Sequence, residues 1–291
     1  MFVHKAAVVG AGTMGGEIAQ VVASSGVPVV LKDIEQKFID AGINKAREVT
    51  EGQMGKLVKK EKITSDQAKE RTAEVMDRIS TTTEYEGFGT VDFVIEAVPE
   101  RMEIKHGVFA ELDEHTPGHA ILSSNTSSLS ISEIGSVTGQ PDQVVEFHFF
   151  YPASMMRLIE IVEGDDSSEE TIQTAVNFAQ QIRKTAIRCG EDPGFVVNRI
   201  LNSSASEVWR HQEETGRSVE ELDKEIGEAK VTPMGPFFLT DMLGLDTVLH
   251  VAEHLSDAYG DRFHVHGQMK ELVDEGNLGA KTGQGYYSHG G

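Results

Sequence analysis

Two side chains in apolar surroundings carry the chemistry of acid–base catalysis. His148 lies inside the run VVEFHFF, and Glu160 follows twelve residues later in the run RLIEIV. Both runs are typical of strands, and a short turn around Pro152 would bring them together side by side. A carboxylate beside an imidazole favours the protonated ring and fixes its tautomer. A single histidine in an apolar strand is more often structural, so the catalytic interpretation depends on this pairing.

Further polar groups follow apolar segments elsewhere in the chain. The cluster SSNTSSL, from Ser123 to Leu129, comes directly after a strand-like run, and Asn198 lies in the apolar segment PGFVVNR. Hydroxyl and amide groups placed in this way can donate hydrogen bonds to an oxygen on which charge develops. These residues are therefore candidates for the same site.

The sequence HVAEH at residues 250–254 fits a zinc-binding pattern with two histidines on one helix face. No third ligand is evident nearby in the sequence, so we expect no metal site. His264 and His266 are interpreted as loop residues.

A glycine pattern near residue 10 predicts a nucleotide site. Glycines with the spacing G-x-G-x-x-G separate the apolar run AAVV from a segment with apolar residues at helical spacing. The first glycine permits a tight turn, the second lets a pyrophosphate approach the backbone, and the third allows close helix–strand packing. A glycine-rich turn that binds nothing is the alternative, and this context argues against it. The loop residues expected to contact the cofactor are Gly10, Ala11, Gly12, Thr13, Met14 and Gly15.

Asp33 ends the next strand-like run, twenty-one residues beyond Gly12. An acidic residue at this place binds the 2′-hydroxyl of an adenosine ribose and repels a 2′-phosphate. No arginine follows closely in the segment DIEQKFID. The sequence therefore predicts NAD rather than NADP as the cofactor.

The composition limits the class of protein. The 291 residues suggest two domains, and a hydrophobic content of 39% with 25% charged residues is typical of a globular protein outside the membrane. The net charge of −21 argues against nucleic acid or an anionic membrane as a partner. This acidity fits either a high-salt organism or an ordinary acidic enzyme. The single Cys189 excludes an internal disulfide, no signal-peptide pattern opens the sequence, and we expect a cytoplasmic location.

Strand and helix patterns alternate over residues 1–190 and predict an α/β fold with a doubly wound, mostly parallel sheet. A mostly polar helical stretch covers about 35–60, and a second helix begins near Ser65 with Thr64 and Gln67 as a capping box. This pair is too long for an ordinary crossover and should project from the sheet. The expected strands lie near 6–9, 27–31, 91–98, 119–125, 144–150, 156–162 and 184–189.

The pattern changes at the segment EDPGF. After Val196 no convincing strand is predicted, and helix-length segments are separated by glycine and proline, as in TPMGPF and LGAKTGQGYY. We therefore place a dinucleotide-binding domain at 1–190 and an α-helical second domain at 191–291.

Seven motifs along the chain give it a close resemblance to a known family. In order they are GAGTMG, SNTSSL, HFF-x-P, RLIEIV, DPGFVVNR, MGPF-x-L-x-D-x-x-G-L-D and GAKTGQGYY. The chain resembles the L-3-hydroxyacyl-CoA dehydrogenases, in particular the 3-hydroxybutyryl-CoA type. The resemblance implies NAD-dependent, reversible oxidation of a 3-hydroxyacyl-CoA to the 3-ketoacyl-CoA, in a homodimer formed through the C-terminal helices.

The resemblance also implies roles for individual residues. His148 matches the family's general base and Glu160 its orienting partner. Ser127 matches a serine that contacts substrate and cofactor, and Asn198 matches an asparagine near the reacting oxygens. The remaining matches are the cofactor contacts Glu100, Lys105 and Lys281, and the CoA-phosphate contacts Lys56 and Lys59.

One position departs from the family pattern. The family usually has HFFNP, with an asparagine on the nicotinamide side, whereas this chain has HFFYP with Tyr151. The bulkier phenol affects the expected nicotinamide contact and the size of the acyl pocket. Two other functions stay open: a dehydrogenase of a free hydroxy acid or sugar acid of the gulonate type, and a non-catalytic NAD-binding structural or sensor protein.

Overall fold

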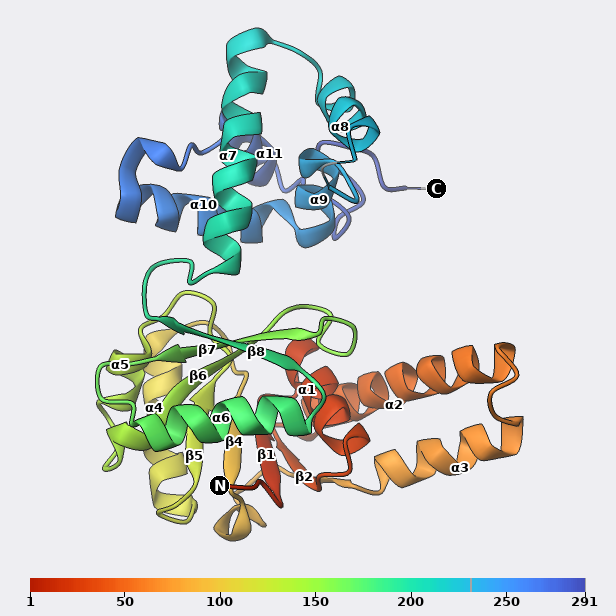
Figure 1. Ribbon diagram of the computed structural model, residues 1–291, viewed down its shortest axis with the longest axis vertical. Helices are drawn as coiled ribbons and strands as arrows, with labels where there is room; N and C mark the ends of the chain where they lie inside the picture. The colour runs from red at the N-terminus through yellow and green to blue at the C-terminus, as the bar shows by residue number, and fades with distance from the viewer. Residues whose placement is uncertain (231, 291) are drawn as a thin grey trace. The chain divides into compact units, whose positions relative to one another are not determined.

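Eight strands form one sheet in the order β3-β2-β1-β4-β5-β6-β7-β8 in the computed structural model, which describes residues 1–230 and 232–290 (Figure 1). Every neighbouring pair is parallel except β6 and β7, which run antiparallel. This arrangement confirms the predicted doubly wound, mostly parallel fold. The strands are β1 (Ala6–Val9), β2 (Val29–Lys32), β3 (Ile79–Thr82), β4 (Phe93–Glu96), β5 (Ile121–Ser124), β6 (Val144–Phe149), β7 (Leu158–Glu163) and β8 (Thr185–Gly190).

Helices cover both faces of this sheet, which is why the central strands are apolar on both sides. Helices α1 (Thr13–Ser24) and α6 (Glu169–Gln181) pack on one face and contribute Ile18 and Phe178 to a core there. Helices α4 (Met102–His115) and α5 (Ile131–Gly135) cover the other face, with Phe109 and Ile134 in a second core. Residues that alternate along one strand therefore enter different cores.

Helices α2 (Gln36–Lys59) and α3 (Ser65–Met76) form an antiparallel pair that extends away from the sheet (Figure 1). Thr64 caps α3: its hydroxyl accepts from the Gln67 amide at 3.2 Å, and the Gln67 side chain accepts from the Thr64 amide at 2.9 Å. The predicted projecting pair and its capping box are both confirmed.

Strand β3 was not predicted. It follows α3 with the sequence ISTT and forms one edge of the sheet, where Ser80 and Thr81 are exposed. An edge strand with one buried face and polar residues lacks the apolar run by which the other strands were recognised. The short 3-10 helices are η1 (Phe88–Thr90), η2 (Pro141–Gln143) and η3 (Gly260–Arg262).

The chain divides into two compact units, Met1–Glu191 and Asp192–Gly291. The described part of the second unit has helices but no strand, apart from isolated bridges that join Gly279 to Gln284 and Gln284 to Ser288. No helix among the described residues is long and apolar enough to cross a membrane. The helices of the second unit are α7 (Val197–Thr215), α8 (Val219–Glu228), α9 (Pro236–Leu243), α10 (Leu245–Tyr259) and α11 (Gly267–Asp274).

The core of the second unit surrounds Trp209 and Phe237, which are fully buried. His266 lies in a loop, as expected, but its ring is buried beside Phe237 and bonds to Tyr286. Burial lowers the pKa of His266 to about 4, so the ring is neutral at pH 7. It is a core histidine.

Candidate active site

The glycine-rich loop leaves open space above the start of α1. Gly10 has φ +97, and a Cβ there would lie 2.5 Å from the Ala97 carbonyl oxygen. A Cβ on Gly15 would lie 1.7 Å from the Gly10 carbonyl oxygen, so both positions require glycine. A Cβ on Gly12 would meet nothing within 4 Å. A ligand can therefore approach the backbone closely at Gly12.

The first turn of α1 has donors but no built-in acceptor. Gly12 caps the helix without a side-chain hydrogen bond, and the first turn contains no acidic residue. Backbone N–H groups at such a terminus bind phosphate oxygens, and the helix dipole favours the negative charge. The residues present therefore fit the pyrophosphate of a dinucleotide.

Asp33 follows β2 directly and lies beside this loop. Its Oδ2 accepts a hydrogen bond from the Ala11 amide at 2.6 Å, and its Oδ1 accepts from the Ile34 amide at 2.7 Å. Each oxygen keeps a lone pair for a further donor such as a ribose hydroxyl. The side chain is only partly buried, so a ligand can reach it.

His148 and Glu160 lie opposite each other on β6 and β7, which confirms the predicted pairing of these two segments. Nδ1 of the imidazole is 2.8 Å from Oε2 of Glu160, and the exposed fractions of the two residues are 3% and 0%. The neighbouring side chains Phe147 and Phe149 belong to the core on the α6 face. Because strand residues alternate, His148 faces the α4–α5 side.

The second ring nitrogen of His148 meets the loop after β5. Nε2 lies 3.1 Å from the hydroxyl oxygen of Ser127. When Nδ1 carries the proton that Glu160 accepts, Nε2 is the ring nitrogen with a lone pair that can accept one. A serine hydroxyl, an imidazole and a buried carboxylate thus form one continuous hydrogen-bonded series.

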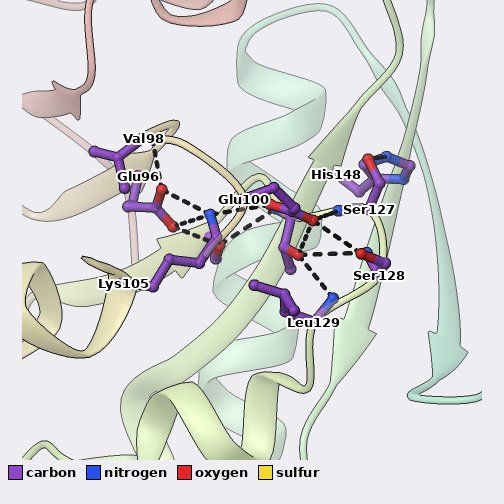
Figure 2. A network of polar contacts seen from close by, with 10 residues as sticks. Glu96, Val98, Glu100, Lys105, Ser127, Ser128, Leu129 and His148 are labelled. Carbon is purple, nitrogen blue, oxygen red and sulfur yellow. Dashed lines mark hydrogen bonds and ion pairs between the residues drawn. The ribbon is translucent and has the colours of Figure 1, made fainter. Parts of the chain in front are cut away.

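A buried ion pair supports the loop that carries Ser127, as Figure 2 shows. The Lys105 ammonium lies 2.8 and 2.9 Å from the two carboxylate oxygens of Glu96, and 3.3 Å from Oε2 of Glu100. Lys105 and Glu96 are 1% and 0% exposed. Ser124 joins this group by donating its hydroxyl to Glu96 at 2.6 Å.

Glu100 connects the ion pair to the loop (Figure 2). Its Oε1 accepts from the Thr126 hydroxyl at 2.6 Å and from the Ser127 amide at 2.9 Å. Burial raises the pKa of Glu100, but the Lys105 ammonium and these hydrogen bonds outweigh it and lower the pKa overall. Glu100 is therefore a carboxylate at neutral pH, and it fixes the Ser127 backbone beside His148.

The other predicted site residues occupy varied places. The Lys105 ammonium is buried among Glu96, Glu100 and Ser124, and the cofactor contact expected of it stays a prediction. Tyr151 follows β6 in a loop and is 53% exposed. The contact expected of Tyr151 with the nicotinamide side of the cofactor stays a prediction.

Asn198 and Lys281 belong to the second unit. Asn198 lies in the first turn of α7, and the Lys281 ammonium is 2.7 Å from Asp246 and 3.1 Å from the Thr247 hydroxyl. Lys56 and Lys59 are exposed in the last turn of α2. The roles expected of these four residues stay predictions.

The zinc-like pattern on α10 does not gather ligands in the part of the chain that the structure describes. Glu253 forms an ion pair with Lys270 at 3.1 Å. Across residues 1–230 and 232–290, no three His, Cys, Asp or Glu side chains are grouped to hold a metal.

The sequence interpretation missed two buried carboxyl groups, Glu96 and Glu146. Both lie in apolar strands and are 0% exposed. Glu146 has no hydrogen-bond partner for either oxygen among the described residues. Burial, with smaller effects of Glu160 and Glu100, raises its pKa well above the ordinary value and so favours the protonated carboxyl group. A charge inside an apolar run was the signal that could have identified both.

A doubly wound sheet with this glycine-rich loop and a histidine–carboxylate pair defines the class of dinucleotide-dependent dehydrogenases. The comparison with family models gives the family. Residues 5–192 match the 3-hydroxyacyl-CoA dehydrogenase NAD binding domain, and residues 194–289 match the 3-hydroxyacyl-CoA dehydrogenase C-terminal domain. The chain belongs to the 3-hydroxyacyl-CoA dehydrogenase family. It is an NAD-dependent oxidoreductase, which confirms the predicted family, enzyme class and cofactor.

Individual relatives agree with this membership. The chain is 40% identical over 286 residues to a 3-hydroxybutyryl-CoA dehydrogenase of Clostridioides difficile. The aligned residues cover 98% of this chain and 99% of that protein. It is 38% identical to a fatty acid oxidation complex subunit alpha of Psychrobacter sp., but spans only 39% of that protein. The crystal structure of (S)-3-hydroxybutyryl-CoA dehydrogenase from Ralstonia eutropha has a TM-score of 0.90 at 35% identity, with both chains fully covered.

Proposed function

We propose that this enzyme oxidises (S)-3-hydroxybutyryl-CoA to acetoacetyl-CoA with NAD, and that the reaction is reversible. The observation that carries the proposal is the series Ser127–His148–Glu160, with contacts of 3.1 and 2.8 Å at the two ring nitrogens. The full-length relatives named 3-hydroxybutyryl-CoA dehydrogenase support the choice of substrate.

In the proposed reaction His148 accepts the proton of the substrate hydroxyl at Nε2. Glu160, 2.8 Å from Nδ1, holds the ring in the required tautomer and stabilises the imidazolium that forms. Bound NAD supplies the acceptor for the hydride that leaves C3. In the reverse direction the imidazolium returns its proton to the oxygen.

In this proposal, groups beside His148 bind the substrate and orient it. The Ser127 hydroxyl, beside the proton-accepting nitrogen, donates to the reacting oxygen. The roles proposed by resemblance are polarisation of the same oxygen or of the thioester carbonyl for Asn198, and a cofactor contact for Tyr151 and for Lys281. Glu100 acts by holding the Ser127 amide at 2.9 Å, and Lys105 acts through Glu100.

The proposal includes a cytoplasmic homodimer that works in fatty-acid oxidation or butanoate metabolism. Large apolar side chains exposed on the helices of the second unit support an interface there. They include Ile200 (61% exposed), Leu201 (46%), Met242 (51%) and Leu243 (45%).

The test is NADH oxidation with acetoacetyl-CoA compared with free acetoacetate. Rapid oxidation with the CoA thioester alone is the expected result. Turnover of free acetoacetate with comparable kcat/KM would favour a free hydroxy-acid dehydrogenase. NADH binding without turnover of either compound would favour a non-catalytic protein.

A further inference from the structure

A cavity of about 220 Å³ lies in the first unit, outside the His148 site. Its wall comes from α1, α2, the loop before β7 and the turn before β8. The side chains that matter for the argument are Ser24, Gln53, Arg157, Arg183 and Lys184. Three of these five carry a positive charge.

Two of the three cationic side chains have no partner among the described residues. Among the residues that the structure describes, the guanidinium groups of Arg157 and Arg183 form neither an ion pair nor a hydrogen bond. The chain has 47 acidic and 26 basic residues, so two uncompensated arginines beside one cavity mark a locally positive place on an acidic protein.

The third cation fixes the wall of the cavity. Lys184 donates to the carbonyl oxygens of Ala153 and Met156, which holds the loop that leads into Arg157. Glu17 is the carboxylate whose charge acts on Lys184, and it is compensated by Lys45 at 3.3 Å. The positive field of the two arginines is therefore not cancelled there.

The polar groups of the wall suit an anion. The Ser24 hydroxyl accepts from the Gln20 amide at 2.9 Å, which leaves its own proton free to donate. Gln20 also donates to the Gln53 side chain at 3.2 Å and so holds it in the wall. Guanidinium forks and hydroxyl donors are the groups that proteins use for phosphate.

The loop between His148 and Glu160 also forms part of the cavity wall. The loop that begins after His148 ends at Arg157, one residue before β7, and Glu160 follows three residues later. Three strand residues span about 10 Å. The thioester and the phosphates of an acyl-CoA are joined by the long pantetheine arm, so they occupy separate sites.

We propose that Arg157 and Arg183 bind a phosphate group of the CoA portion of the substrate, which rests on the function proposed above. The site adjoins α2 at Gln53, one turn before Lys56. On this acidic chain, the positive charge that a phosphate needs therefore comes mainly from Arg157 and Arg183, in the segments that precede β7 and β8.

The test compares KM and kcat for acetoacetyl-CoA and for acetoacetyl-pantetheine, which lacks the phosphates of CoA. The variant is Arg157→Gln with Arg183→Asn. Asparagine is chosen because Arg183 has φ +63, a conformation that asparagine tolerates. Arg188→Gln is the control, since it removes one charge from an exposed arginine that pairs with Glu163 and Glu169.

We expect the double variant to raise KM for acetoacetyl-CoA by about tenfold or more at unchanged kcat, with KM for the pantetheine thioester unaltered. The control should change neither. An unchanged KM for acetoacetyl-CoA, or an equal rise for both thioesters, would overturn the inference while leaving the proposed reaction intact. If wild-type enzyme turns over neither thioester, the proposed function itself is wrong.

Discussion

His148 and Glu160 face each other across the single antiparallel pair of the sheet, with Nδ1 and Oε2 2.8 Å apart. The distance follows from register, because directly opposed residues on neighbouring strands have their side chains on the same face. A slip of one residue would turn Glu160 to the other face. The contact between His148 and Glu160 is therefore fixed by the same hydrogen bonds that join β6 to β7.

The first prediction concerns this pair. His148→Gln should lower kcat by about 100- to 10,000-fold while NADH binding is retained, because the proton acceptor is removed. Glu160→Gln keeps the shape of the side chain but loses the charge that stabilises the imidazolium, so it should also lower kcat. The double variant should be little worse than the worse single variant, since residues that act as a unit are not additive.

Steady-state kinetics and NADH titration of all three variants give the answer. Near-normal turnover in His148→Gln would make His148 a core histidine. Impairment in the double variant alone would contradict the functional pairing with Glu160.

The second prediction concerns cofactor choice. Asp33 lies beside the glycine-rich loop with its carboxylate bound to the Ala11 amide, where it would repel a 2′-phosphate. Wild-type enzyme should show a much higher kcat/KM with NADH than with NADPH, and Asp33→Ala should reduce that preference. Comparable kcat/KM values with both cofactors in the wild-type enzyme would refute the assignment.

The third prediction concerns Tyr151, which stands where the family usually has asparagine. If its exposed phenol faces the acyl pocket, it limits the length of the acyl chain. Tyr151→Asn should then raise activity on a C10 substrate relative to a C4 substrate. An unchanged ratio of kcat/KM for the two chain lengths would show that the side chain points elsewhere.

The sequence allowed the fold and the central pair to be predicted because both depend on local patterns. Apolar runs marked seven of the eight strands, and β3 was missed because the edge sequence ISTT has no such run. The facing of His148 and Glu160 followed from two apolar segments around one turn.

The supporting residues could not be found in this way. The ion pair of Glu96 with Lys105 joins a strand end to a helix, and no sequence spacing shows that a lysine turns inward. The sequence therefore did not show that Lys105 is buried beside Glu100, and its cofactor contact stays a prediction. For Glu146, the face of the strand on which it lies became known only with the sheet.

The fourth prediction concerns the buried ion pair. Lys105→Met should lower the free energy of unfolding by about 3–5 kcal/mol, because Glu96 would be left charged and buried without its cation. It should also lower kcat, since Glu100 would no longer be held in place beside the Ser127 amide. Denaturant unfolding and steady-state kinetics measure the two effects.

Lys69→Met is the matched control for that experiment. Lys69 and Asp66 form an exposed pair 3.7 Å apart on α3, and their side chains are 82% and 96% accessible. The control should change the free energy of unfolding by less than about 1 kcal/mol. A similar loss in both variants would mean that the Lys105 pair contributes no more than a surface pair.

The last prediction concerns Glu146, whose carboxyl oxygens have no partner among the described residues. Its folded-state pKa is raised well above normal, chiefly by burial. Below a pH of about 4.3 both the folded and unfolded states hold the proton. Above that pH the unfolded chain releases the proton while the folded chain retains it, so this residue makes stability fall as pH rises towards the folded-state pKa.

Glu146→Gln keeps the size of the side chain and cannot ionise, so it should be increasingly more stable than the wild type as pH rises from 5 to 8. Denaturant unfolding at three or four pH values measures the gap. Glu163→Gln serves as the control. Glu163 ends β7, is partly exposed and pairs with Arg188, so its variant should show no gap from wild type that widens with pH. A gap between Glu146→Gln and wild type that stays constant with pH would show that Glu146 ionises normally in the folded protein, and that an unseen donor satisfies it.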